Sequence, residues 1–335
     1  MHILLVKLSS LGDVIHNFPI VTDIRRAYPH AIVDWATDAS YASVVAMHPG
    51  INRVLPVHLR ALKKSWSQPR GYWQLLADRK MLGHEKYDLT IDTQGLLKSG
   101  LVAYCAGSDI AGYDKNSIRE PIVSRFYQRQ YAVSRTEHAV VRNRRLAALA
   151  LDYQLPAICD YGITAPTVAS AITPTNKPYA VLLHATSRSD KTWDVSSWIA
   201  LGRALNQTGL TVVLPSGNAA EYATSQRIAS GLEYAQALDN MPLSATAAMI
   251  ARAAFVVGVD TGLTHLAVAL NRPTVGIYLT TQPALTGLYA GRSNNDANNV
   301  ITVNLGGGTR QQATIVGVED VLAVLAGVTM RAGTT

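Results

Sequence analysis

An aspartate and a histidine five residues apart border a stretch that is suited to bind a phosphate. The apolar run 256–259 ends at Asp260-Thr261-Gly262-Leu263-Thr264-His265, after which apolar residues resume with helical spacing. The pattern predicts a buried strand, a turn and a helix. Amides at the start of that helix, with its dipole, favour an anion, and Gly262 lets the backbone approach it closely. Asp260 or Thr261 can equally be a plain helix cap and His265 a structural histidine, so this stretch alone leaves both interpretations open.

Further side chains on the second half of the chain are suited to hold a nucleotide. Thr186, Ser187 and Lys191 follow an apolar run, and hydroxyls and a lysine on such a loop can clamp a diphosphate. Glu221 follows the next apolar run, where a carboxylate can accept both hydroxyls of a ribose, and Met241 can pack against an adenine face. The ordinary alternatives are a glutamate in the first turn of a helix and a methionine that fills a core.

Asp13 is placed to act as a base. It follows the first apolar run, near the start of a predicted helix, and ligands bind at the carboxyl ends of strands in open parallel sheets. Gly12 permits a tight turn beside it, and Pro19 must kink the helix or lie in its first turn. An aspartate in this setting is commonly a helix N-cap, and Lys7 can be a charge that merely ends the strand, so both interpretations stay open.

These candidate residues require parallel strands that end beside one another, and apolar runs alternating with helical patterns predict such a sheet. The predicted strands are 2–7, 32–36, 54–57, 87–92, 179–184, 211–215, 256–259 and 273–278. A proline-rich stretch at about 152–178 predicts a linker. We therefore expect a doubly wound α/β protein with two domains, 1–165 and 166–335.

Composition excludes several classes of protein. Cys105 and Cys159 are far apart and lack the spacing of a zinc site or a disulfide framework. The opening apolar run is too short for a signal peptide, and no stretch approaches the ~18 apolar residues of a membrane span. The first turn lacks G-x-G-x-x-G, and Gly95-Leu-Leu-Lys-Ser-Gly100 lacks the Lys-Ser/Thr of a P-loop, which argues against a dehydrogenase and a P-loop enzyme.

Positive charge is concentrated in the first half of the chain. Residues 1–165 hold 20 Lys/Arg against 14 Asp/Glu, whereas residues 166–335 hold 10 against 9. The first half should therefore meet an anion-rich partner. The basic stretches contain aromatic residues but no nucleic-acid-binding pattern, so we expect a phosphorylated or carboxylated acceptor and no nucleic acid. A solvated basic face is the other interpretation.

Five segments together resemble the bacterial ADP-heptose:lipopolysaccharide heptosyltransferases. They are Lys7-Leu-Ser-Ser-Leu-Gly-Asp13-Val, Ile91-Asp-Thr-Gln-Gly-Leu-Leu-Lys98-Ser, Arg119-Glu-Pro, His184-Ala-Thr-Ser-Arg-Ser-Asp-Lys191-Thr-Trp193 and Asp260-Thr-Gly-Leu-Thr-His265, and they occur in the family's order. The resemblance implies a GT-B fold, with two Rossmann-like doubly wound domains that face each other across a cleft. The N-terminal domain would bind the acceptor and the C-terminal domain ADP-heptose.

By the same resemblance, the protein is an inverting glycosyltransferase that moves L-glycero-D-manno-heptose from ADP-heptose to the Kdo of Kdo-lipid A. Asp13 matches the catalytic base, and Lys191 assists the departure of ADP. The implied donor-binding residues are Thr186, Ser187, Lys191, Glu221, Met241, Asp260, Thr261, Gly262, Thr264 and His265. The implied acceptor-binding residues are Lys7, Arg60, Lys63, Lys64, Lys98 and Arg119. We expect no metal and no cofactor, a monomer, and a cytoplasmic protein with at most peripheral contact to the inner membrane.

One loop departs from the family's pattern. Tyr278-Leu-Thr-Thr-Gln-Pro283 stands where many members carry Tyr-Gly-Pro-Thr-Asp-Pro, which puts roles of that glycine and aspartate in doubt. Two rival functions remain: a later heptosyltransferase that uses a heptose acceptor, and a nucleotide-binding protein without catalytic activity.

Overall fold

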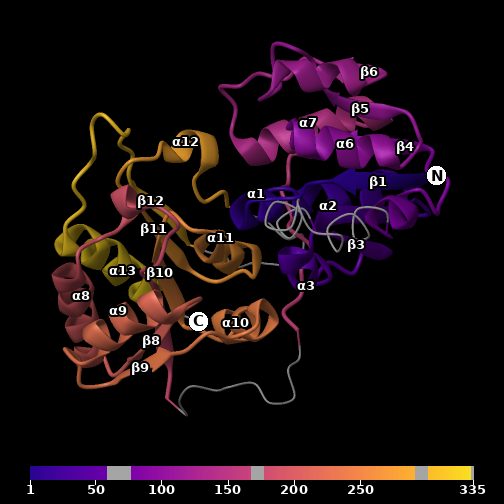
Figure 1. The fold of residues 1–335 in the computed structure, drawn as a ribbon. Coiled ribbons are helices and arrows are strands. Elements are labelled where there is room, and N and C mark those ends of the chain that lie inside the picture. Colours follow the sequence, from indigo (N-terminus) through magenta and orange to yellow (C-terminus); the bar gives the residue numbers. More distant parts are fainter. Residues whose placement is uncertain (59–76, 167–176, 291–300, 333–335) are drawn as a thin grey trace. The chain divides into compact units, whose positions relative to one another are not determined.

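Two Rossmann-like units make up the protein in the computed structural model (Figure 1). They comprise Met1–Thr164 and Ala165–Thr335. The structure describes residues 1–58, 77–166, 177–290 and 301–332. In the described ranges, no helix is both long enough and apolar enough to cross a membrane.

The first unit is a six-stranded parallel sheet with helices. Its strand order is β3-β2-β1-β4-β5-β6. The strands are β1 His2–Val6, β2 Ile32–Asp38, β3 Arg53–Val57, β4 Leu89–Asp92, β5 Ile110–Tyr113 and β6 Arg129–Tyr131. The helices are α1 Leu11–Ile15, α2 Phe18–Ala27, α3 Ala42–Val45, α6 Leu97–Cys105 and α7 Ala139–Leu151, with short 3-10 turns η1 Ala39–Tyr41 and η2 Pro121–Phe126.

The second unit repeats the architecture. Its strand order is β12-β11-β10-β7-β8-β9, again parallel throughout. The strands are β7 Tyr179–Leu183, β8 Thr211–Pro215, β9 Ala235–Leu238, β10 Phe255–Val259, β11 Thr274–Tyr278 and β12 Thr302–Gly306. The helices are α8 Val195–Gln207, α9 Ala219–Ala229, α10 Leu243–Ile250, α11 Gly262–Ala269, α12 Pro283–Thr286 and α13 Val318–Ala332, with the 3-10 turn η3 Ser189–Lys191.

Burial on both faces explains the apolar runs of the strands. Every residue of β7, β8, β10 and β11 is buried. One face of the second sheet packs against α8, α9 and α13 through a cluster that includes Trp193, Trp198 and Val257. Parallel sheets covered on both sides have this composition because each side chain, whichever way it points, meets a helix. The predicted α/β doubly wound fold is confirmed.

The order of the strands positions the candidate residues. In both units the strands, counted along the chain, lie in the order 3-2-1-4-5-6, which reverses direction between the first and fourth strands. Ligands bind at such a reversal, outside the carboxyl ends of the two strands. In the first unit β1 pairs with β4, and in the second β7 pairs with β10. The loops that follow these four strands carry most of the predicted site.

Two local expectations had different outcomes. Pro19 lies in the first turn of α2, one of the two places that the sequence allowed for it, because proline lacks the amide that an inner turn requires. The tight turn that Gly12 permits does not form there, because Gly12 lies inside α1. The left-handed glycine of this region is Gly95, with φ of +67°, where an added Cβ would lie 2.6 Å from the Ile118 side chain.

Candidate active site

In the second unit, Lys191 and Asp260 form an ion pair at the end of β10. The Lys191 ammonium donates to Asp260 Oδ2 at 2.5 Å, and His265 Nε2 lies 3.8 Å from Oδ1. Thr186 Oγ1 donates to the Asp260 carbonyl at 3.1 Å. The pairing of β7 with β10 therefore brings together residues that are 74 positions apart in the chain.

Asp260 is held in its ionised form. Burial acts to raise its pKa, but hydrogen bonds from His265, Lys191 and Thr281 and the charge of Lys191 outweigh burial, so the pKa lies well below its ordinary value. The contact from Thr281 gives the atypical loop 278–283 a role at the site. On the same loop, Thr280 Oγ1 donates to Asp190 at 3.3 Å.

The start of α11 lies against β10. Thr261 is the N-cap in an extended conformation, and the Thr264 hydroxyl donates to the Val259 carbonyl at 2.8 Å. A Cβ at Gly258 would lie 2.3 Å from the Thr264 hydroxyl oxygen, so this approach requires glycine at 258. The first amides of a helix have no acceptor within the helix, and those of Gly262 and Leu263 are available to an anion, whereas the Thr264 amide donates to the Thr261 carbonyl at 3.1 Å.

A pocket of about 370 Å³ lies beside these residues, between the loops that follow β7 and β8. Its lining includes Thr186, Trp193 and Glu221. The volume is within the range of about 300–1,000 Å³ that is usual for small-molecule sites. Both Glu221 oxygens already accept hydrogen bonds, from the Gly217 amide and the Asn218 side chain, each at 2.7 Å. A ribose at Glu221 would share or displace these bonds.

A row of buried, hydrogen-bonded side chains lies next to this pocket, and the sequence did not predict it. His184 Nε2 lies 2.7 Å from Ser225 Oγ, which lies 2.9 Å from Ser216 Oγ. Burial lowers the pKa of His184, so the ring is neutral at pH 7. Among the remaining predicted donor residues, Ser187 is exposed and Met241 is partly buried just before α10.

In the first unit, Asp13 caps the helix on which it lies. Its Oδ2 accepts from the Ser10 amide at 2.8 Å and from the Ser10 hydroxyl at 2.9 Å. The N-cap that the sequence left open for Asp13 is Ser10 instead, and Asp13, three residues later, completes a capping box by accepting from the N-cap residue. These hydrogen bonds leave the carboxylate available to a ligand, because Asp13 is partly exposed and both bonds use the same oxygen. A carboxylate fixed in this way can accept a proton through its other oxygen.

The loop that precedes α1, the helix of Asp13, is tied to the end of β4. Gln94 Oε1 accepts from the Leu8 amide at 2.6 Å and from the Ser9 amide at 3.4 Å. Lys98 donates to Ser9 Oγ at 2.6 Å. Gln94 is buried, and its two hydrogen bonds fix the backbone that precedes the candidate base.

Lys7 and Asp92 lie beneath this loop. The Lys7 ammonium is buried and donates to the Thr93 carbonyl at 2.9 Å, and burial lowers its pKa although Asp13 and Asp92 oppose the shift. Burial likewise raises the pKa of Asp92, against hydrogen bonds that include one from Tyr127 at 2.7 Å. The sequence shows β4 ending at Asp92, but it gives no signal for Tyr127, 35 residues further on.

Three of the predicted acceptor residues, Arg60, Lys63 and Lys64, lie outside the described residues. Arg119 is exposed, two residues before η2. In the described ranges, no group of three or more His, Cys, Asp or Glu side chains is arranged to hold a metal ion.

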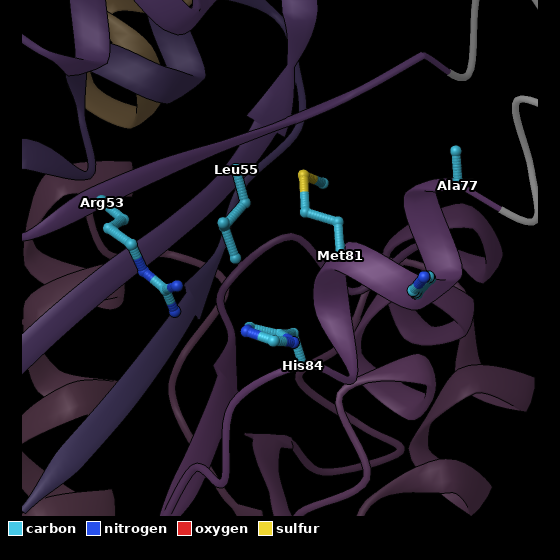
Figure 2. Close-up of a pocket in the computed structure, with 6 residues that line it drawn as sticks. Arg53, Leu55, Ala77, Met81 and His84 are labelled. Atoms are coloured by element: carbon cyan, nitrogen blue, oxygen red, sulfur yellow. The ribbon is translucent and has the colours of Figure 1, made fainter.

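A second pocket, of about 350 Å³, lies away from the ends of β1 and β4. Arg53 is the first residue of β3, so this pocket is at the amino ends of the strands, opposite Asp13. Figure 2 shows the side chains of Arg53 and His84 extending toward one another, with Leu55 and Met81 beside them. Arg53 donates to Asp34 at 2.7 Å and to Glu85 at 2.9 Å, which accounts for its charge.

Comparison with known proteins gives a consistent result. The family model of glycosyltransferase family 9 (heptosyltransferase) matches residues 75–305. Lipopolysaccharide heptosyltransferase 1 of Pseudomonas aeruginosa is 44% identical over 88% of this chain and 82% of its own length. The structure of E. coli heptosyltransferase WaaC with ADP has a TM-score of 0.85 at 35% identity and covers 98% of this chain and 99% of its own. WaaC with ADP-2-deoxy-2-fluoro heptose has a TM-score of 0.81 at 33% identity, with the same coverage of both chains.

Proposed function

The chain belongs to glycosyltransferase family 9, the heptosyltransferases, and from this premise we propose its acceptor and its mechanism. It is a glycosyltransferase of GT-B type that transfers heptose in the biosynthesis of the lipopolysaccharide inner core, with a nucleotide-linked heptose as donor. We infer that the donor is ADP-L-glycero-D-manno-heptose, that the acceptor is the Kdo of Kdo-lipid A, and that transfer inverts the anomeric configuration.

The gathering of Lys191, Thr186 and the start of α11 around Asp260 supports donor binding most directly. When the bond between the anomeric carbon and the phosphate oxygen breaks, negative charge grows on ADP. An ammonium and preorganised amides offset that charge, so the proposed mechanism needs neither a metal nor a cofactor. Glu221 and Met241 are assigned to the ribose and the adenine, and Asp260 and His265 to the heptose.

Asp13 is assigned as the general base. The acceptor hydroxyl oxygen forms a bond to the anomeric carbon of heptose while its proton passes to Asp13. The bond from that carbon to the diphosphate breaks, and ADP leaves with the electron pair. Attack from the face opposite ADP inverts the configuration. Ser10 supports this assignment because its two hydrogen bonds fix the carboxylate in one orientation.

The acceptor is inferred from charge. The carboxylates of Kdo and the phosphates of lipid A match the excess of cations in residues 1–165. Lys98 of α6 donates to Ser9, which lies in the loop before α1 and Asp13, and Arg119 is exposed in the same unit. Arg60, Lys63 and Lys64 complete the proposed set on the strength of the sequence. We take the active form to be a monomer at the cytoplasmic face of the inner membrane.

The test measures ADP release from ADP-L-glycero-β-D-manno-heptose, with and without de-acylated Kdo-lipid A, and then the mass and anomeric configuration of the product. We expect release that depends on the acceptor and a gain of one heptose. In the Asp13→Ala variant, turnover should fall about 10²–10⁴-fold while donor affinity stays near that of the wild type. Asp109→Ala is the control, because Asp109 is an exposed aspartate of the same unit. Near-normal turnover of Asp13→Ala contradicts the assignment.

Two alternatives have distinct outcomes in the same assay. A later heptosyltransferase would release ADP with an acceptor that already carries heptose, and Kdo-lipid A lacking heptose would not compete with it. A protein that binds nucleotide without catalysis would bind the donor and release no ADP with either acceptor.

A further inference from the structure

Helix α6 of the first unit, labelled in Figure 1, carries exposed apolar side chains. Leu97, Leu101 and Tyr104 are 46%, 49% and 66% exposed and lie on one side of the helix, because residues four and three apart stack along its axis. Ile122 of the adjoining η2 is 53% exposed. We call these four side chains the α6–η2 surface.

The clustering distinguishes this surface from ordinary exposed leucines. Single apolar side chains on a surface need no explanation, whereas a group of them indicates contact with another molecule. Among the described residues, nine large apolar side chains are exposed, and four of the nine lie here. Their exposure is not a sign of poor packing, because the other side of α6 is well packed: Val102 and Ala103 are buried there.

The two elements are held together, so the surface has a fixed shape. Glu120 Oε2 accepts from the Leu97 amide at 2.7 Å and thereby ties the segment before η2 to the first turn of α6. The rings of Tyr104 and Phe126 lie edge to face with centroids 6.4 Å apart.

Cations flank the apolar side chains. Lys98 is on the first turn of α6, and Arg119 and Arg125 are exposed on either side of Ile122. Glu120 is the acid among them, and it already accepts from the Leu97 amide. Apolar side chains next to Lys and Arg suit the interface of an anionic bilayer, where the apolar groups enter the headgroup boundary and the cations meet the lipid charge.

Size favours a bilayer over a protein partner. A stable protein interface uses about 20–30 residues on each side and about 800 Å² from each partner. Four apolar side chains fall well short of that number, whereas a membrane contact needs only a few inserted groups supported by charge. A second copy of the chain is therefore the less favoured occupant.

The surface also lies at the correct edge of the unit. Helix α6 begins five residues after the end of β4, and Lys98 in its first turn contacts Ser9, which lies in the loop before α1 and Asp13. We propose that the α6–η2 surface docks the protein on an anionic lipid bilayer, with the carboxyl edge of the first sheet next to the membrane. The purpose of this orientation rests on the proposed lipid acceptor; the binding itself does not.

The test uses the full-length protein and sedimentation with lipid vesicles. One set contains phosphatidylcholine alone, and the other an equimolar mixture with phosphatidylglycerol. We expect binding to the anionic vesicles that weakens with salt. The Leu97→Ser/Leu101→Ser variant should bind at least about tenfold more weakly, because both inserted side chains are lost. Arg125→Gln should bind about fivefold more weakly, the effect of one cation near an anionic surface.

Matched controls separate docking from a general effect of substitution. Leu149→Ser removes another 46% exposed leucine, on α7, and Arg227→Gln removes an exposed arginine of α9. Both should bind like the wild type. Wild-type binding by the double leucine variant, or an equal loss in Leu149→Ser, overturns the proposal. So does a dimer in solution that becomes a monomer in the double leucine variant, since a second copy would then occupy the surface.

The vesicle assay needs neither donor nor acceptor, so its result is independent of the proposed function. Turnover of the de-acylated acceptor should be unchanged in the double leucine variant, because that substrate is in solution. Vesicle binding in the absence of heptose transfer would leave the docking surface in place and remove the proposed acceptor. Heptose transfer without vesicle binding would support the proposed acceptor and overturn the docking surface.

Discussion

Replacing Lys191 by methionine separates two roles that its position allows. Its ammonium is 2.5 Å from Asp260 Oδ2, and the side chains are 17% and 12% exposed. Removing one partner of a fully buried pair costs about 3–5 kcal/mol. Here both groups retain some solvent and Asp260 keeps His265 and Thr281, so we expect the free energy of unfolding to fall by about 2 kcal/mol. For a unit of 171 residues, this lowers Tm by about 4–8 °C.

Donor affinity should fall for a different reason. A charge-assisted hydrogen bond to a phosphate contributes about 1.5–3 kcal/mol, and each 1.4 kcal/mol is about a factor of ten in Kd. We therefore expect Lys191→Met to weaken ADP binding by about 10–150-fold. The unpaired Asp260 carboxylate would add repulsion of the diphosphate.

The Lys191→Met/Asp260→Asn variant decides between the two roles, because it removes the uncompensated carboxylate. If Lys191 clamps the diphosphate, the double variant regains most of the lost stability but little of the lost affinity. Thermal unfolding measures the first quantity and titration calorimetry with ADP the second. Recovery of ADP affinity in the double variant, or affinity within twofold of wild type in Lys191→Met, would show that Lys191 serves only to pair Asp260 and would refute the clamp.

Two further predictions concern the first unit. Gln94→Leu should lower kcat about tenfold and leave ADP affinity unchanged, because the acceptor for the Leu8 and Ser9 amides is lost close to Asp13. Gln94→Glu keeps an acceptor oxygen and should restore part of kcat. A loss of stability without a loss of kcat would show that Gln94 does not position the base. Burial lowers the pKa of His48 to about 4, so between about pH 6.5 and 4 the unfolded chain binds a proton that the folded chain does not. The free energy of unfolding should therefore fall by about 3 kcal/mol as pH falls through that window. Measured by urea unfolding, it should depend less steeply on pH in His48→Asn than in the wild type, and equal slopes would contradict the reasoning.

Periodicity and turn residues were sufficient to predict the fold class. The strands around β1, β7 and β10 were found because burial on both faces gives long apolar runs. Four strands were missed: β5, β6, β9 and β12. β6 has three residues, and none of them is buried, so it lacks an apolar run. β12 is only partly buried, and β9 includes a glutamine. β6, β9 and β12 are edge strands, which carry a weaker apolar signal because one of their sides has no neighbour. β5 is an interior, buried strand, but its four residues, Ile-Ala-Gly-Tyr, are too few for a clear apolar run.

The site was predictable only in part for a similar reason. Asp13, Lys191 and Asp260 each follow a recognisable strand, and their turns have characteristic residues. The contact between Lys191 and Asp260 depends on strand order, which local sequence does not determine. Gln94 lies in the segment 91–99 that carries part of the family resemblance, but its role depends on the pairing of β4 with β1. Ser225 beneath His184 has no local signal, because a serine in a helix is ordinary.

Each sheet is built from one half of the chain, and among the described residues no strand crosses from one sheet to the other. The two halves of the chain can therefore evolve independently. Under the proposed function, the first half binds the acceptor and the second half the nucleotide. Substitutions in the first half can then change which sugar or lipid is accepted without passing through forms that have lost the nucleotide, and substitutions in the second half can refine the use of the nucleotide at a constant acceptor. A lineage built in this way can diversify its products one half at a time.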